Sequence, residues 1–381
     1  MQPSEGIRYL SGADVLRAAA RLDPVALVRE ALVLHAGGRT TLPAEAYLAW
    51  SAGDGSFARS LALPGALWGA RPAIGVKLIN SSLGNPAHGL PRAQGLTVLF
   101  DRDTAYPVAI MEGAHLSALR TSAYTALSVL LLGPAEPATV AVIGCGALGA
   151  SHVRLLARTM PGVRFELHDT STDRRDALVA ALRAEGLECG AAATAEAAVR
   201  AAAVVVTATT TTTSYLPFAW LAPGALVAHV SLDDVFPDVV RRADLVIVDD
   251  WALVSADDRR LLGRMYRGGD LRGPAGEAYG PAPTAGREAT PAGPAAPMAA
   301  PKAVPKAVPM AAPKAAPKDA PATRRVDATL ADVVSGRHPG RTAPEQIILS
   351  NPFGMGILDV ALAAEVLRVA ERDALGVLLP R

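Results

Sequence analysis

The sequence predicts an α/β fold of two domains, together with one long irregular segment. Strand and helix patterns alternate from about residue 138 onward, which indicates a parallel sheet covered by helices. A glycine-rich turn joins the first strand of that run to its helix. The chain has 381 residues, and this length favours two domains over one.

Composition excludes several classes of protein. The 37 basic and 36 acidic residues leave a net charge of +1, which gives no general attraction for nucleic acid or a membrane surface. Two cysteines, Cys145 and Cys189, make neither a disulfide framework nor a metal site. The chain has no apolar run long enough to span a membrane, and its first residues lack a signal-peptide pattern. We therefore expect a cytoplasmic protein with no metal and no nucleic-acid or membrane partner.

The first third of the chain mixes helices and strands. Residues 10–36 form an amphipathic pattern that Pro24 divides into two helices, and Ser11 with Asp14 predicts an N-cap. Further on, the sequence predicts strands at 73–79, 95–100 and 108–111, followed by a helix at 114–132.

The middle of the chain alternates regularly. ATVAVIG predicts a buried strand and ASHVRLLARTM a helix. RFELHD and RRDALVAALRAEG repeat that order, and AAVVVTAT, ALVAHVS and DLVIVDD are further strand candidates.

Composition changes between about 271 and 325. Proline recurs every fourth residue, at Pro297, Pro301, Pro305, Pro309, Pro313, Pro317 and Pro321. Proline at this density is incompatible with an α-helix or an interior strand, so we expect a flexible segment that is partly polyproline II. Its lysines suit an acidic partner, but an expanded loop without a role is the simpler interpretation.

Order resumes near residue 326. TLADVVSG predicts a helix, EQIILSNPFG a strand and turn, and ILDVALAAEVLRVAERDA a final helix. We expect this tail to return to the first domain, so that residues 1–134 and 326–381 form one domain and 135–270 the other.

Gly144, Gly146 and Gly149 form a G-x-G-x-x-G pattern between a strand and a helix. The first glycine permits the tight turn, the second lets a pyrophosphate approach the backbone, and the third lets helix and strand pack closely. Ala147 and Leu148 lie at the helix N-terminus, whose free N–H groups attract phosphates. The pattern predicts a Rossmann dinucleotide-binding unit.

Asp169 closes the second strand of this unit, 20 residues after Gly149. A carboxylate there accepts hydrogen bonds from a ribose 2′-hydroxyl and repels a 2′-phosphate, so NAD is favoured over NADP. Thr207 and Thr209 follow a later strand and are candidates for the cofactor cleft. The alternative is that the run Thr207–Thr213 simply extends the strand.

Lys77 and Arg120 are cations in apolar surroundings. Lys77 lies in a predicted strand and Arg120 in the predicted helix at 114–132. Together they suggest capture of an amino-acid-like carboxylate, to which the guanidinium fork is suited. A structural salt bridge for each is the competing interpretation.

Several motifs resemble the ornithine cyclodeaminase/μ-crystallin family. They are GVKLINS, DRDTAYPVAIMEG, LSALRTSAYTAL and VIGCGALGASHVRLL. NSSLGNPAHGLPRAQG, HVSLDD and PGRTAPEQIILSNPFGMGILDVALA resemble its branch of dehydrogenases from 2,3-diaminopropionate biosynthesis. The resemblance implies a Rossmann domain inserted into an α+β substrate-binding and dimerisation domain, and a homodimer.

The resemblance also implies roles for single residues. Lys77 and Arg120 match the family's substrate-carboxylate residues, with Lys77 among the catalytic group, and Thr121 matches a residue near the cofactor. The family's catalytic acid/base corresponds to Asp234, with Asp233 as the alternative. Cyclodeaminases place this aspartate after two glycines, whereas Ser231 and Leu232 stand here, which puts ornithine cyclodeamination in doubt. From the residues alone, either acid is also a candidate N-cap of the helix that follows.

The implied activity is an NAD-dependent oxidative cleavage of an opine-like conjugate of two amino-acid units. N-(1-amino-1-carboxy-2-ethyl)-glutamate is such a substrate and would give 2,3-diaminopropionate and 2-oxoglutarate. A cyclising ammonia-lyase, an imine reductase and an alanine dehydrogenase are the alternatives among enzymes. A μ-crystallin-like binding protein is the alternative without catalysis.

Overall fold

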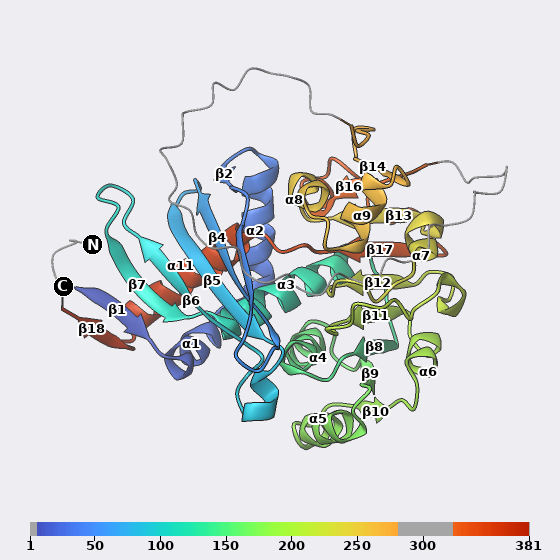
Figure 1. Cartoon of the computed structure of the whole chain (residues 1–381), viewed down its shortest axis with the longest axis horizontal. Coiled ribbons are helices and arrows are strands. Elements are labelled where there is room, and N and C mark those ends of the chain that lie inside the picture. The colour runs from blue at the N-terminus through green and yellow to red at the C-terminus, as the bar shows by residue number, and fades with distance from the viewer. Residues whose placement is uncertain (1–5, 281–322, 381) are drawn as a thin grey trace.

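The computed structural model describes residues 6–280 and 323–380, and two large sheets divide it into two regions that lie side by side (Figure 1). This arrangement confirms the predicted α/β fold. The proline repeat lies outside the described residues, so its polyproline conformation stays a prediction. None of the helices in the described ranges is long and apolar enough to cross a membrane.

The first sheet has the order β18-β1-β7-β6-β5-β4-β2, with β3 paired to β4. Apart from the parallel pair of β1 and β7, its strands run antiparallel. The strands are β1 (Ile7–Leu10), β2 (Thr40–Thr41), β3 (Ala46–Ser51), β4 (Phe57–Leu67), β5 (Ala73–Ser82), β6 (Ala93–Phe100), β7 (Pro107–Glu112) and β18 (Val377–Leu379).

The helices beside this sheet are α1 (Gly12–Ala19), α2 (Pro24–Ala36), α3 (Ala114–Leu132) and α11 (Gly356–Arg372). Ser11 and Asp14 form the expected capping box of α1, and Pro24 opens α2 as predicted. Helix α11 packs against β4, β5 and β6, and α3 packs against both α11 and the second region. These helices therefore bury one face of the sheet.

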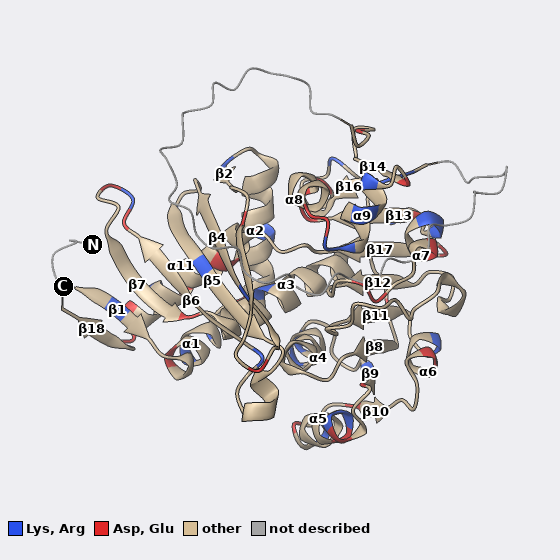
Figure 2. Cartoon of the chain, in the orientation of Figure 1, with Lys and Arg blue, Asp and Glu red and all other residues tan. Residues whose placement is uncertain are grey.

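The two faces of the first sheet differ in what covers them. Gly65 on β4 packs against Ile357 of α11, so this is the covered face of the sheet. The β4 residue two positions before Gly65 lies on the same face and pairs with Lys77 of β5, so Lys77 is on the covered face as well. The opposite face carries two apolar rows, formed by Ala46, Ala62, Leu78 and Leu96 and by Pro64, Val76, Val98 and Ile110. None of the described helices covers those rows in Figure 1, and their strands carry few charges in Figure 2.

The second sheet is parallel throughout, in the order β10-β9-β8-β11-β12-β17-β13-β16. Its strands are β8 (Thr139–Ile143), β9 (Arg164–His168), β10 (Cys189–Ala191), β11 (Val204–Thr207), β12 (Leu226–His229), β13 (Leu245–Val248), β16 (Ala328–Thr329) and β17 (Ile348–Asn351). The central strands β11 and β12 are buried along their whole length, as expected of a sheet with helices on both faces.

The helices that accompany this sheet are α4 (Ala147–Thr159), α5 (Thr172–Ala184), α6 (Ala195–Arg200), α7 (Pro237–Arg242), α8 (Trp251–Ala256), α9 (Leu261–Arg267) and α10 (Leu330–Val334). The short strands β14 (Leu271–Arg272) and β15 (Arg324–Arg325) pair in parallel beside them. The segment between 272 and 324 therefore leaves and rejoins the fold at one place.

The tail departs from its predicted place. We expected residues 326–381 to return to the first domain, but β16 and β17 pair with strands of the second sheet. The apolar run around Ile348 and Leu349 explains this, because a strand buried on both faces is most stable inside a parallel sheet. Only α11 and β18 rejoin the first sheet.

Candidate active site

The glycine turn lies between β8 and α4, near the centre of the parallel sheet. Gly144 has a φ of +105°, and a Cβ there would meet the carbonyl oxygen of Ala208 at 2.6 Å. A Cβ on Gly149 would lie 1.9 Å from the oxygen of Gly144, whereas one on Gly146 would meet no atom within 4 Å. Two of the glycines are thus required by the turn, and the third leaves an open approach to the backbone.

The N-terminus of α4 lies on that open approach. Gly146 is its N-cap and supplies no side-chain hydrogen bond, so the N–H groups of the first turn, starting at Ala147 and Leu148, point outward without a cap. These free N–H groups, together with the open space over Gly146, fit the pyrophosphate of a dinucleotide.

Asp169 follows β9 and lies against the glycine turn. Its Oδ2 accepts a hydrogen bond from the N–H of Cys145 at 2.8 Å, and its Oδ1 accepts one from the N–H of Ser171 at 2.8 Å. Arg174 is mostly exposed, and its Nη1 lies 3.9 Å from the carboxylate. Asp169 therefore braces the turn through both of its carboxylate oxygens.

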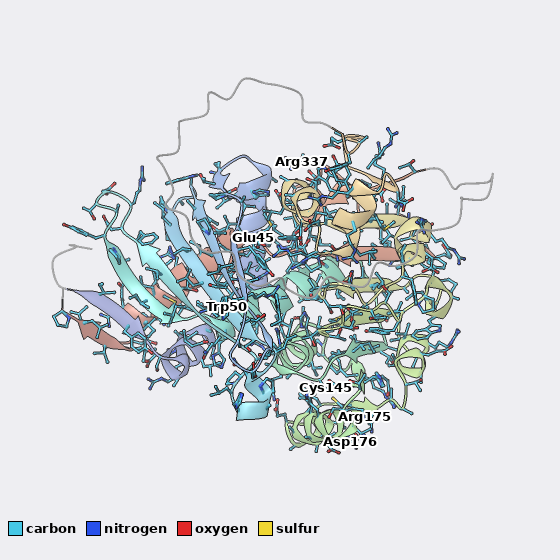
Figure 3. The ribbon with its side chains drawn as sticks, in the orientation of Figure 1. Glu45, Trp50, Cys145, Arg175, Asp176 and Arg337 are labelled. Atoms are coloured by element: carbon cyan, nitrogen blue, oxygen red, sulfur yellow. The ribbon has the colours of Figure 1, made fainter. Side chains whose placement is uncertain are left out.

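Cys145 is buried in the turn. Figure 3 labels it in the same part of the molecule as Arg175 and Asp176 of α5. Burial, with the charge of Asp169, raises the pKa of its thiol to about 12. The thiol is therefore neutral at physiological pH, as expected of a buried cysteine that takes no part in chemistry.

Helix α3 lies directly against α4. Ser122 donates to Ser151 at 2.8 Å, and Thr125 contacts Nε2 of His152 at 3.0 Å. Thr121, one residue before Ser122, is buried and donates to the carbonyl oxygen of Ser117 at 2.7 Å. These contacts place the helix that carries Arg120 and Thr121 against α4, whose N-terminus follows the glycine turn.

Lys77 and Arg120 come together on one carboxylate. Lys77 Nζ lies 2.9 Å from Oδ2 of Asp359, and Arg120 Nε lies 3.2 Å from Oδ1 of the same residue. Asp359 and Lys77 are fully buried, and Arg120 is 8% exposed. Two cations against one carboxylate leave one excess positive charge in a buried place.

The sequence interpretation missed Asp359. Both alternatives for Lys77 and Arg120 included an ion pair or a ligand, but neither named this partner. Asp359 is the one charged residue in the apolar stretch GILDVALA. A single charge among apolar residues is also the pattern that indicated Arg120, so the same pattern could have indicated Asp359.

Gly354 lies over the far end of the Arg120 guanidinium. A Cβ on Gly354, whose φ is +117°, would come within 3.1 Å of Nη2 and 3.2 Å of Nη1. Neither Nη atom has a hydrogen bond within the described residues. The outer nitrogens of Arg120 therefore face a residue without a side chain.

Asp234 belongs to a second polar cluster, where β11 and β12 end. Its Oδ1 accepts hydrogen bonds from Thr209 at 2.7 Å and Tyr215 at 2.9 Å, and its Oδ2 lies 3.6 Å from Nε2 of His229. Asp234 is fully buried. Burial alone would raise its pKa, but hydrogen bonds and the proximity of His229 hold the pKa below its ordinary value. The group is therefore a carboxylate at neutral pH.

Asp233 faces away from this cluster, and Thr207 contacts it through Ser231. Asp233 forms an ion pair with Arg264 of α9. Thr207 is fully buried, and its hydroxyl is 3.5 Å from that of Ser231. Strand β11 ends at Thr207, so the interpretation of Thr207–Thr213 as an extended strand is wrong. The N-cap interpretation of the two aspartates is wrong as well, because the N-cap of α7 is Phe236.

The loop after β17 touches both clusters. Asn351 donates to the carbonyl oxygen of His229 and to its Nδ1, both at 2.9 Å, and Gly354 lies against Arg120. Asn351 ends β17 and Gly354 lies three residues further on, so their Cα atoms are no more than about 10 Å apart.

Glu45 closes the boundary between the two regions, where Figure 3 shows it. Its carboxylate lies 2.5 Å from Arg259 of the second region. A cavity of only about 10 Å³ remains here, lined by Leu42, Pro43, Glu45, Leu63, Pro64, Leu253, Gly354 and Gly356. This volume holds about one water molecule.

The glycine turn and the parallel sheet define a two-domain protein with a Rossmann unit. The chain belongs to the ornithine cyclodeaminase/mu-crystallin family, whose model matches residues 10–257.

Among curated relatives, it is similar to N-((2S)-2-amino-2-carboxyethyl)-L-glutamate dehydrogenase of Staphylococcus aureus, at 26% identity over 97% of each chain. Among solved structures, it is similar to CmnK, at 38% identity and a TM-score of 0.81 over 99% of this chain and 98% of that one. It is also similar to an archaeal alanine dehydrogenase dimer with bound NAD, at 21% identity and a TM-score of 0.74 over 98% of both chains.

Proposed function

We propose that this chain is an NAD-dependent dehydrogenase that cleaves an N-linked conjugate of two amino-acid units. The substrate is N-(1-amino-1-carboxy-2-ethyl)-glutamate or a close analogue, and the products are 2,3-diaminopropionate and 2-oxoglutarate. The observation that carries the proposal is the buried pair Lys77 and Arg120, with one uncompensated positive charge beside the Rossmann unit. The Staphylococcus aureus relative bears the name of this activity and matches the chain over nearly its whole length.

The cofactor is held by the glycine turn. The free N–H groups at Ala147 and Leu148 bind its pyrophosphate, Gly146 leaves room for it, and Asp169 selects the 2′-hydroxyl of NAD. Thr121 and Thr209 stand on the elements that border it. NAD supplies a hydride acceptor at the carbon that bears the substrate nitrogen.

The substrate is held by its carboxylate. The outer nitrogens of Arg120 and the ammonium of Lys77 bind a carboxylate and fix the adjacent Cα, because orientation is a large part of such catalysis. Oxidation of that Cα leaves a C=N bond, water adds to the carbon, and the C–N bond breaks to release the keto acid and the amine.

Protons leave the substrate during these steps. Asp234 is the proposed proton acceptor, since its low pKa keeps it ionised. Its Oδ2 accepts no hydrogen bond within the described residues, and Nε2 of His229 lies 3.6 Å from it. Asp233 is the alternative and is at present held by Arg264.

The assembled form is a homodimer in which a second copy covers the apolar rows of the first sheet. Leu96 is 40% exposed, and the neighbouring Leu48 and Trp50 on β3 are 63% and 46% exposed. An open apolar face of this kind marks an interface. The similar archaeal alanine dehydrogenase is described as a dimer.

An assay of the purified protein tests the activity. NADH, 2-oxoglutarate and 2,3-diaminopropionate should appear in equal amounts when the conjugate and NAD are supplied. Ammonia release from a diamino acid without net NADH would instead indicate the cyclising lyase. Absence of turnover with every N-linked conjugate would overturn the proposal.

A further inference from the structure

We propose that Asp359 is a positioning residue for substrate binding, which holds Lys77 and Arg120 in place and leaves the outer nitrogens of Arg120 to the substrate carboxylate. The assignment rests on the proposed function, because it takes those two cations as the substrate anchors. Asp359 itself does not touch the substrate in this arrangement.

Each carboxylate oxygen of Asp359 binds one of the two cations. Oδ2 binds Nζ of Lys77 and Oδ1 binds Nε of Arg120, and the two partners lie 282 and 239 residues away in the sequence. Because the carboxylate takes the Nε edge, the two Nη atoms remain for a carboxylate ligand. Gly354 keeps the space next to those atoms free of a side chain.

The charges distinguish this arrangement from a structural ion pair. One cation would satisfy a structural carboxylate, and a second buried cation would only add repulsion and desolvation cost. Here a second cation is present, so Asp359 neutralises only one of the two positive charges, and the Nη atoms of Arg120 have no hydrogen bond within the described residues. An arrangement of two cations on one carboxylate is completed by an anion.

The protonation of Lys77 depends on the same contact. Burial and the charge of Arg120 on α3 lower the pKa of Lys77 to about 8, and Asp359 on α11 and Glu45 before β3 oppose that change. Ser117 is its further polar neighbour, at 3.3 Å. Without Asp359 the pKa of Lys77 falls further, so Lys77 loses its proton, and the substrate one of its anchors, at lower pH.

Binding of 2-oxoglutarate, measured by calorimetry on the NAD-loaded protein between pH 6.5 and 9, tests this assignment. The affinity of the wild type should fall above about pH 8, as Lys77 becomes neutral. In Asp359→Asn the affinity for 2-oxoglutarate should be weaker than in the wild type by roughly tenfold or more at neutral pH. The pH above which the affinity falls should also be lower than in the wild type, by about one pH unit or more. The conjugate's KM should follow the same pattern, with the KM for NAD unchanged.

Two further variants keep the test decisive. Glu365→Gln removes a carboxylate on the same helix that pairs with Arg368 and Arg71, and it should behave like the wild type. Asp359→Glu keeps the charge but moves it, so binding should weaken while the pH of the fall stays near that of the wild type. This variant decides the matter if Asp359→Asn does not fold, since an unchanged affinity in it would contradict a positioning role.

The outcomes separate this assignment from the activity. Affinity curves that superimpose for the wild type and Asp359→Asn would overturn the assignment, as would a wild type whose binding does not depend on pH. If the wild type forms no NADH with the conjugate, but Asp359→Asn still displaces the pH dependence of 2-oxoglutarate binding, the proposed activity is wrong and the role of Asp359 stands.

Discussion

The carbonyl oxygen of Gly144 lies 1.9 Å from the point that a Cβ on Gly149 would occupy. Gly149→Ala should therefore push the turn apart, with a loss of roughly 1–3 kcal/mol in the free energy of unfolding and a loss of NAD binding. Gly146→Ala adds its Cβ to open space, so its stability should stay within about 0.5 kcal/mol of the wild type while NAD affinity is lost. Thermal unfolding and NAD titration of both variants check this pair, and normal NAD binding by Gly146→Ala would contradict it.

Lys77→Met should separate function from stability. With the pKa of Lys77 lowered to about 8 in the folded state, the buried charge costs free energy below that pH. Between about pH 8 and 10.5 the unfolded state holds this proton more strongly, so the contribution of Lys77 to stability rises with pH in that window. At pH 7 the variant removes the cost and leaves the Arg120–Asp359 pair neutral.

At pH 7 we therefore expect the free energy of unfolding of Lys77→Met to equal or exceed that of the wild type. Its KM for the conjugate should nevertheless be much higher. Denaturant unfolding and steady-state kinetics measure the two effects. A destabilised protein with an unchanged KM would instead favour a purely structural ion pair.

Asp234→Asn should lower kcat by about 10²-fold or more, since the amide cannot accept a proton. Asp233→Asn breaks a partly exposed pair with Arg264 and should cost far less. Tyr215→Phe removes one hydrogen-bond donor from Asp234 and serves as a milder change at the same carboxylate. If Asp233→Asn proves to be the slower enzyme, the acid/base role passes to Asp233.

His152 should make the protein sensitive to mild acid. Burial lowers its pKa from 6.5 to about 4 in the folded state. The unfolded state therefore binds more protons between those values, and stability falls as the pH drops through that window. The contribution of His152 should decrease by roughly 2 kcal/mol between pH 7 and pH 5. Denaturant unfolding measures the free energy of unfolding at both pH values. The loss of this free energy from pH 7 to pH 5 should be smaller for His152→Gln than for the wild type, and equal losses would count against the prediction.

The apolar rows of the first sheet predict a specific effect on assembly. Val76→Arg places a charge in the middle of the uncovered face, and a buried unpaired charge is costly at an interface. The variant should be a folded monomer when its mass is measured by light scattering, with the wild type a dimer. The register of β4 and β5 places Arg59 on the other face of the sheet, away from the apolar rows. Arg59→Lys is therefore a control that should leave the measured mass unchanged.

Local patterns were enough to predict much of the fold. The spacing of the three glycines located β8 and α4, and Pro24 located the start of α2. Strand β3 was not predicted, because every one of its residues is exposed and its apolar side chains give no alternation against a core. The place of β17 was missed for another reason, since the strand pairs in a parallel sheet with β12, more than a hundred residues earlier.

The sequence allowed single residues of the candidate site to be predicted, but not the contacts between them. Lys77 and Arg120 stand out in the sequence as charges in apolar surroundings, whereas the choice of Asp234 rests on the family resemblance. His229 is five residues before Asp234, but the other partners come from distant segments: Asp359 from α11 and Asn351 from β17. Such pairings depend on tertiary contacts, so no local pattern reveals them.

Strands β14 and β15 pair at Leu271 and Arg324, on the margin of the second region. The chain between them can thus change in length without moving any anchor of the glycine turn or of Asp359, since its cost is mainly the entropy of closing one loop. This position is a natural entry point for protein engineering: a fluorescent domain or an affinity module whose own ends lie close together could replace the proline repeat and report on the enzyme without entering its chemistry.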